Sequence, residues 1–283
     1  IYTGEDTLSL HDALPIFGEV DWNPATKIAQ LNVVVGDEHP FIPKFVVGKR
    51  TSNRANAAIV PASQTDLCIF TAWRLIEDGQ SVLVFCPIRV SVIPFAKRII
   101  ELSNKGMLPL IMTPPSTAIA SALAVGAEWF GQDHEILKCL RMGVAVHHGE
   151  LPTQFRKEVE HLLREGILKL TVSSPTLAQG LNLAATSLIF HGHSRHGEAI
   201  DESEFRNVIG RAGRAYVDIE GLVLYPMFDQ HEKRREAWQG LMRGDKQREM
   251  ESGIFRLLYW LLDRMAKMLG TRNVDALLAY VAG

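Results

Sequence analysis

The chain has little of what marks secreted, membrane-spanning or metal-binding proteins. Its three cysteines, Cys68, Cys86 and Cys139, show no CxxC spacing, so the sequence indicates neither a disulfide framework nor a cysteine metal site. It has no run of 18 apolar residues, the length that a helix needs to cross a membrane. We therefore expect a cytoplasmic protein that makes no membrane contact.

The sequence also lacks an excess of charge of either sign. The formal net charge is -2, so any contact with a nucleic acid must come from a local patch. Two suggestive stretches are incomplete. Residues 37–40 (Asp-Glu-His-Pro) lack the apolar strand that leads into an acidic metal-binding box, and residues 48–51 (Gly-Lys-Arg-Thr) follow Pro43 where a phosphate loop requires glycine. Neither stretch is interpreted as a site.

Short apolar runs alternate with helical patterns along most of the chain. Two β-rich runs, 31–35 and 41–47, come first, and a helix is expected at 61–79. Buried strands are then expected at 82–85, 144–146, 168–172, 187–190 and 222–225, and helices at 89–102, 116–140 and 152–164, with Gly126 and Gly131 as possible breaks in the second of these. The alternation predicts an α/β fold with a mainly parallel sheet flanked by helices.

The two ends of the chain differ from this α/β region. Residues 7–16 resemble a translated sequencing adapter, so we treat 1–16 as a non-native segment and place the α/β domain at 17–228. Residues 229–283 are polar and then broadly apolar with helical spacing, which predicts the start of a short all-helical C-terminal region. We expect the chain to be a fragment that is incomplete at both ends.

Polar residues follow the predicted strands at 86–89, 147–150 and 173–182. In parallel sheets ligands bind at the carboxyl ends of the strands, so these loops are the expected site. A fourth segment, 204–214, places Arg211 and Arg214 three residues apart on a helix end, behind Gly210 and Gly213. Two guanidinium groups that each follow a glycine within one or two residues can be approached closely, and such a pair suits a phosphate chain. The alternative is a basic helix end that caps its own carbonyls or pairs with Glu202 and Glu204.

Two other groups of residues allow different chemistry. His191, His193 and His196 with Glu198 could hold a metal, but no second ligand cluster matches them, and we assign no metal site. His148 with Glu150 could form a general acid and base pair, although no nucleophile motif accompanies it.

The four segments resemble, in order and spacing, the second RecA-like domain of superfamily 2 helicases, closest to the DExH branch that includes superkiller-type helicases. Residues 82–89 (Val-Leu-Val-Phe-Cys-Pro-Ile-Arg) are similar to motif IV, and residues 147–149 (His-His-Gly), with Arg156 downstream, are similar to motif IVa. Residues 174–183 (Ser-Pro-Thr-Leu-Ala-Gln-Gly-Leu-Asn-Leu) resemble motif V, and residues 207–214 (Asn-Val-Ile-Gly-Arg-Ala-Gly-Arg) resemble motif VI.

The resemblance implies roles for the matching residues. Arg211 and Arg214 are implied as arginine fingers on the phosphates of ATP, with Mg²⁺ and ATP held mainly by another RecA-like domain that precedes this one. The further nucleotide-facing residues are Gly180, Asn182, Asn207 and Gly210. The sugar-phosphate backbone of one DNA or RNA strand would be held by Arg89, His148, Gly149, Ser174 and Thr176, largely without regard to base sequence.

Two departures from the family pattern bear on function. Asn207 stands where the family usually has Gln or His, and its shorter side chain puts its orienting role in question. These residues contain no Walker A loop and no acidic DExH box, so the chain alone is expected not to hydrolyse ATP. The implied activity is that of an ATP-dependent nucleic-acid helicase or translocase in the full-length protein. The alternative is a non-enzymatic RecA-like module for nucleic-acid binding or scaffolding.

Overall fold

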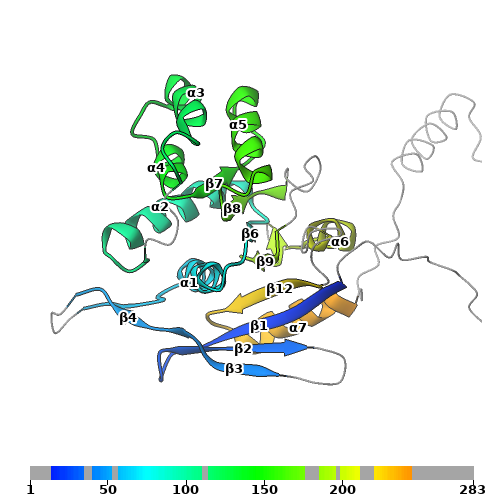
Figure 1. Cartoon of the computed structure of the whole chain (residues 1–283). Coiled ribbons are helices and arrows are strands. Elements are labelled where there is room, and N and C mark those ends of the chain that lie inside the picture. The colour runs from blue at the N-terminus through cyan, green and yellow to red at the C-terminus, as the bar shows by residue number, and fades with distance from the viewer. Residues whose placement is uncertain are drawn as a thin grey trace, which may run out of the picture. The chain divides into compact units, whose positions relative to one another are not determined.

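A single eight-stranded sheet organises the protein in the computed structural model, which describes residues 14–34, 40–52, 57–109, 114–175, 185–195, 198–210 and 220–243. The strand order is β3-β2-β1-β12-β9-β6-β8-β7, and Figure 1 shows the sheet rising in this order from β3 at the bottom to β7 at the top. Several strands that are neighbours in the sheet are not consecutive in the chain, so crossover connections, which carry helices, link the parallel strands. The mainly parallel α/β fold predicted from the sequence is confirmed.

Six strands of the sheet run parallel to one another. They are β1 (Leu14–Asn23), β6 (Val82–Phe85), β7 (Val144–His147), β8 (Leu170–Ser173), β9 (Ser187–Phe190) and β12 (Glu220–Met227). The strands β2 (Ile28–Val34) and β3 (Phe41–Val47) extend the sheet beyond β1 as an antiparallel pair. Two small ribbons lie apart from the sheet: β4 (Lys49–Arg50) with β5 (Ile59–Val60), and β10 (Ser194–Arg195) with β11 (Glu198–Ala199).

Helices cover both faces of the sheet. The helices are α1 (Gln64–Glu77), α2 (Val92–Asn104), α3 (Ala120–Phe130), α4 (Glu135–Arg141), α5 (Thr153–Arg164), α6 (Glu202–Ile209) and α7 (His231–Arg243), and a 3-10 turn, η1 (Arg89–Ser91), precedes α2. Within the described residues, no helix is long and apolar enough to cross a membrane.

The strand β6 shows how the two faces are divided. Val82 and Val84 belong to the larger core, which packs α1 to α5, whereas Leu83 and Phe85 belong to the core that packs α6 and α7. Successive side chains of a strand point to opposite faces, so a continuous apolar run is what a strand covered on both sides requires. All four residues of β6 are buried, as are all four of β9.

Several helix ends follow from local sequence. Ser63 caps α1 by accepting a hydrogen bond from the Asp66 amide, and Gly131 ends α3 in a left-handed conformation, with φ +83°. The expected break at Gly131 is therefore confirmed. Gly126 does not break the helix but lies inside α3, where an added Cβ would sit 2.5 Å from Leu137 and 2.8 Å from Phe155. The glycine at this position allows close packing of α3 on its neighbours.

The two ends of the described chain pack on the sheet. The strand β1 starts at Leu14, inside the segment 1–16 that we set aside as non-native, and it pairs with β12 from that residue onward. The helix α7 lies beyond residue 228, and its Trp238 is fully buried in the core that contains Tyr225. The adapter origin of 1–16 and the domain boundary after residue 228 remain predictions.

Candidate functional site

The loops after β6, β7 and β8 begin side by side at the carboxyl edge of the sheet. Phe85 and His147 are both in register with Ser173, so the three strands end at the same level. The Cys86 amide donates to the Ser173 carbonyl at 2.7 Å, and the Ser174 amide donates to the His147 carbonyl at 3.2 Å. These backbone bonds fix the start of each loop. The starts of the three loops therefore lie in one row.

Arg89 and Glu150 join the first two loops. Arg89 opens the turn η1 after β6, Glu150 follows β7, and their side chains form an ion pair. Both are solvent-accessible, at 44% and 68% relative exposure, so the pair is of the kind that contributes little to stability. Arg89 remains accessible to an anion, but an anion that binds it must compete with the Glu150 carboxylate.

His148 lies next to this pair and is half-buried. Burial lowers the pKa of His148 below its ordinary value, and the neighbouring Arg89 charge lowers it further. Among the described residues, neither ring nitrogen of His148 has a hydrogen-bond partner. A neutral imidazole has one hydrogen bond to donate, but both ring nitrogens are covered in the structure, so the groups around His148 must move before a ligand can reach them. Gly149 follows it and is exposed, so the backbone there is open to close approach.

Ser174 is buried, at 1% exposure, and its amide is already used by the His147 carbonyl. Its neighbour Ser173 donates its hydroxyl to the Ser174 carbonyl at 2.9 Å. These bonds hold the backbone at the start of the segment 174–183, so Ser174 contributes to the shape of the loop. Its predicted contact with a nucleic-acid strand remains a prediction.

The helix α6 carries the start of the fourth predicted segment. Asp201 caps it by accepting the Glu204 amide at 2.7 Å, and this bond lowers the pKa of the Asp201 carboxyl below its ordinary value. Phe205 and Val208 bury one side of the helix, while Asn207 and Gly210 are exposed. An added Cβ at Gly210 would meet nothing closer than 3.4 Å, so local packing does not require glycine there.

The two glutamates of the alternative reading have other partners. Glu202 pairs with Arg206 at 2.5 Å on the same helix, and Glu204 accepts from Arg195 at 2.6 Å. Both carboxylates thus have arginine partners among the described residues, and the alternative in which they pair with Arg211 or Arg214 stays a prediction. Arg211 and Arg214 themselves lie outside the described residues, as do Thr176, Gly180 and Asn182.

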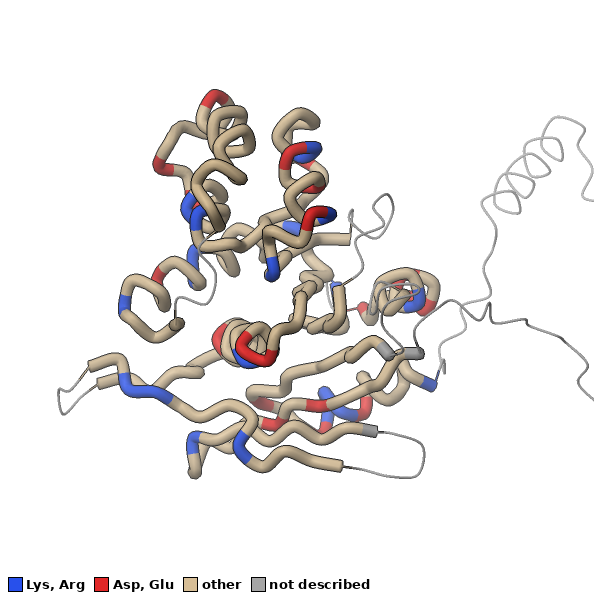
Figure 2. Tube along the Cα trace, in the orientation of Figure 1, with Lys and Arg blue, Asp and Glu red and all other residues tan. Residues whose placement is uncertain are grey.

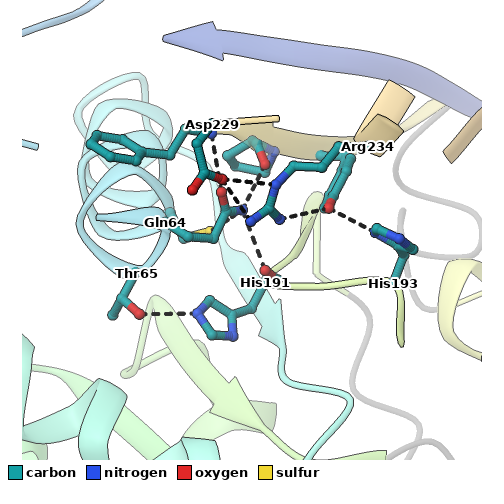
Figure 3. Close-up of polar contacts among 10 residues, drawn as sticks. Gln64, Thr65, His191, His193, Asp229 and Arg234 are labelled. Carbon is teal, nitrogen blue, oxygen red and sulfur yellow. Dashed lines mark hydrogen bonds and ion pairs between the residues drawn. The ribbon is translucent and has the colours of Figure 1, made fainter. Parts of the chain in front are cut away.

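The histidines after β9 take part in a polar network that packs the loop onto α1 and β12 (Figure 3). His191 Nε2 lies 3.0 Å from Thr65 Oγ1, and His193 Nδ1 lies 2.7 Å from the Tyr225 hydroxyl. Arg234 of α7 donates to the same hydroxyl at 3.1 Å. Across the part of the chain that the structure describes, no three metal-ligating side chains gather into a group.

Charge is interspersed over the domain. Figure 2 shows acidic and basic residues scattered over the helices and strands, in agreement with the small net charge. Attraction of a polyanion therefore depends on the local groups at the carboxyl edge of the sheet.

Sequence reasoning did not single out two residues that join these elements. Gln64, the first residue of α1, donates to the Pro226 carbonyl at 2.6 Å and accepts the Phe228 amide at 3.1 Å. Arg195 donates to the Pro87 carbonyl at 2.8 Å as well as to Glu204. Neither belongs to a run with a recognisable spacing, because their partners are 9 to 164 residues away in sequence.

Comparison with known proteins agrees with this arrangement. Residues 123–216 match the helicase conserved C-terminal domain family. The Hachiman protein HamB of Bacillus cereus is 28% identical over 229 residues, which cover 77% of this chain and 20% of that protein. The ATP-dependent DNA helicase Hel308 of Methanocella arvoryzae is 30% identical over 182 residues, 62% of this chain and 23% of that protein.

A more distant relative is the mouse DNA polymerase theta, 27% identical over 168 residues, 55% of this chain and 7% of that protein. The chain thus spans about a fifth or less of the length of these three relatives.

Proposed function

We propose that the chain works as the second RecA-like domain of an ATP-dependent nucleic-acid helicase or translocase. The match of residues 123–216 to the helicase conserved C-terminal domain family and the similarity to DNA helicases support this proposal. The relatives that bear the name DNA helicase favour DNA as the nucleic acid. ATP and Mg²⁺ are proposed to be held mainly by a preceding RecA-like domain, and the bound nucleotide supplies the phosphoryl transfer.

The carboxyl edge of β6, β7 and β8 is proposed to hold the backbone of one strand. Arg89 supplies a charge-assisted donor, neutral His148 supplies a ring N–H, and Gly149 leaves room for the strand. Contacts from Ser174 and Thr176 are part of the proposal, although Ser174 is buried and Thr176 lies outside the described residues. Such donors contact phosphates and do not read bases, so affinity should depend on salt and little on base sequence.

The end of α6 is proposed to face the nucleotide. Arg211 and Arg214 place guanidinium groups on the phosphates, and Asn207, Gly210, Gly180 and Asn182 line the approach. The exposure of Asn207 and Gly210, and the pairing of Glu202 and Glu204 with other arginines, support this assignment.

One observation carries the proposal more than any other: the backbone bonds from Cys86 to Ser173 and from Ser174 to His147. They align the starts of three loops, although the bonded residues Cys86 and Ser173, and His147 and Ser174, are far apart in sequence. A row of donors along one edge of a parallel sheet fits an extended phosphate backbone.

The test is Arg214→Ala in the complete gene product. Arginine fingers accelerate nucleotide hydrolysis by about 10³- to 10⁵-fold, so the variant should lose almost all ATPase activity. Binding of a single strand should be retained, as measured by fluorescence anisotropy. A variant that keeps more than about a tenth of the wild-type turnover would contradict the arginine-finger role.

A non-enzymatic binding or scaffolding module is the second candidate. A helicase-like domain can be kept for binding alone, because a fold by itself does not determine an activity. It is favoured if the complete protein binds a strand equally well with and without a non-hydrolysable ATP analogue and Arg214→Ala leaves cellular function unchanged.

A further inference from the structure

Arg195 joins two parts of the site that are far apart in sequence. It lies in β10, the first strand of the small ribbon between β9 and α6. Its Nε donates to the Pro87 carbonyl at 2.8 Å, and its Nη2 donates to the Glu204 carboxylate at 2.6 Å. Pro87 is 108 residues earlier in the chain, and Glu204 is nine residues later.

Each acceptor belongs to a segment with a proposed role. Pro87 is buried in the loop after β6, two residues before Arg89. Glu204 lies in α6, one turn before Asn207, on a helix that leads into Gly210 and the arginine pair. A displacement of either segment therefore acts directly on the hydrogen bonds of Arg195.

The loop that carries Arg195 is itself anchored on the sheet and on α1. The His191 amide donates to the Phe85 carbonyl at 2.9 Å, and the His191 carbonyl accepts from Gln64 Nε2 at 3.3 Å. His193 contacts Tyr225, and the Ile200 amide closes the ribbon onto the His193 carbonyl at 3.0 Å. Arg195 thus extends from a fixed base, so its two hydrogen bonds can transmit a shift between their acceptors.

We propose that Arg195 is a positioning residue that couples the strand-binding loop after β6 to the arginine-bearing end of α6. The inference rests on the proposed function of these two segments. A guanidinium group is suited to the task because its planar set of five donors can hold a carbonyl and a carboxylate at the same time. In this arrangement, a strand phosphate that shifts the loop at Pro87 changes the placement of α6.

The experiment compares ATP hydrolysis by the complete protein with and without a saturating single-stranded DNA oligonucleotide. We expect Arg195→Ala and Glu204→Ala each to lower the ratio of the two rates by about fivefold or more, the smallest effect typical of coupling between sites. Glu204→Gln keeps an oxygen acceptor for Arg195 and should restore most of the ratio. The double variant should lose no more than either single one, since both remove the same contact.

Arg206→Ala is the matched control. Arg206 lies on the same helix, is 70% exposed and pairs with Glu202 on that helix, so its loss removes the same charge without breaking the bridge. Its ratio should stay within about twofold of wild type, below the smallest effect expected for the bridge. A role of Arg195 in stability alone would lower both rates together and leave the ratio unchanged.

Two results would overturn the inference: an Arg195→Ala ratio within about twofold of wild type, or an equal loss of ratio in Arg206→Ala. Arg214→Ala, run in parallel, separates this failure from failure of the proposed function. If Arg214→Ala abolishes hydrolysis while Arg195→Ala keeps the ratio, only the coupling is refuted. If Arg214→Ala is as active as wild type, the arginine-finger role itself is refuted.

Discussion

Glu150 offers a direct test of the proposed strand-binding edge, because its carboxylate forms an ion pair with Arg89 in the structure. A strand phosphate at Arg89 has to replace this carboxylate. Changing Glu150 to glutamine removes the competing charge and keeps nearly the same shape. We therefore expect Glu150→Gln to bind single-stranded DNA more tightly than the wild type, an outcome opposite to the usual effect of a substitution inside a binding site.

The exposure of the two side chains sets the size of the effect. Pairs as exposed as Arg89 and Glu150, at 44% and 68%, contribute about 0 to 1 kcal/mol. At 1 kcal/mol, the form with the Arg89–Glu150 pair is about five times more populated than the form in which Arg89 is open. The apparent affinity for the strand is then the intrinsic affinity multiplied by the open fraction. Removing the competition should therefore raise the affinity by about two- to sixfold.

Fluorescence anisotropy with a labelled oligonucleotide, repeated over a series of salt concentrations, measures this change. Glu77→Gln is the control, because Glu77 is an exposed glutamate paired with Arg74 on α1 and its loss changes the net charge equally. Arg89→Ala should weaken binding and reduce the slope of log affinity against log salt by about 0.7, the value for one phosphate contact on a single strand. Weaker binding by Glu150→Gln, or an equal gain in Glu77→Gln, would refute the reasoning.

Two further predictions concern stability. Asp66→Ala should lower the free energy of unfolding, measured by chemical denaturation, by about 3 kcal/mol, because buried Asp66 accepts two hydrogen bonds from Arg98. Glu101 is an exposed partner of the same arginine, so Glu101→Gln should lower it by less than about 1 kcal/mol. Similar losses in the two variants would contradict the role of the buried pair. Burial, with a smaller contribution from a nearby arginine, lowers the pKa of His191 to about 4, so the folded state binds fewer protons than the unfolded state and stability should fall as pH drops from about 6.5 to 4. His191 as a whole is only partly buried, so the loss should be about 2 to 3 kcal/mol, and a His191→Gln profile as steep as the wild type would refute this assignment.

The strands and the order of the motifs could be read from the sequence because they depend on local patterns. The run 82–85 is buried on both faces, and an uninterrupted apolar run of this length is what such a strand requires. The expected helix at 152–164 and the observed α5, Thr153–Arg164, agree because its apolar stripe and its end at Gly166 are local as well. The antiparallel pairing of 28–34 with 41–47 follows from two β-rich runs with a short connection.

Other features depended on contacts that local patterns do not encode. Glycine at 126 predicted a possible break, but close packing against Phe155 keeps it inside α3. The strand β1 was not predicted, because its first residues lie in the segment 1–16 that was set aside as non-native. It pairs with β2, which follows it directly in the chain, and its pairing with β12, some 200 residues away, leaves no local spacing to read.

The sequence by itself determined the alternation of strands and helices, the order of the four motifs and the chemical types of the donors, because each of these lies within a few consecutive residues. Only the tertiary structure decided that Glu150 pairs with Arg89 and that Arg195 bridges Pro87 and Glu204 of α6. Ion pairs and hydrogen bonds form between whichever groups the fold brings within about 3 Å of one another, and that proximity is set by strand order and crossover connections.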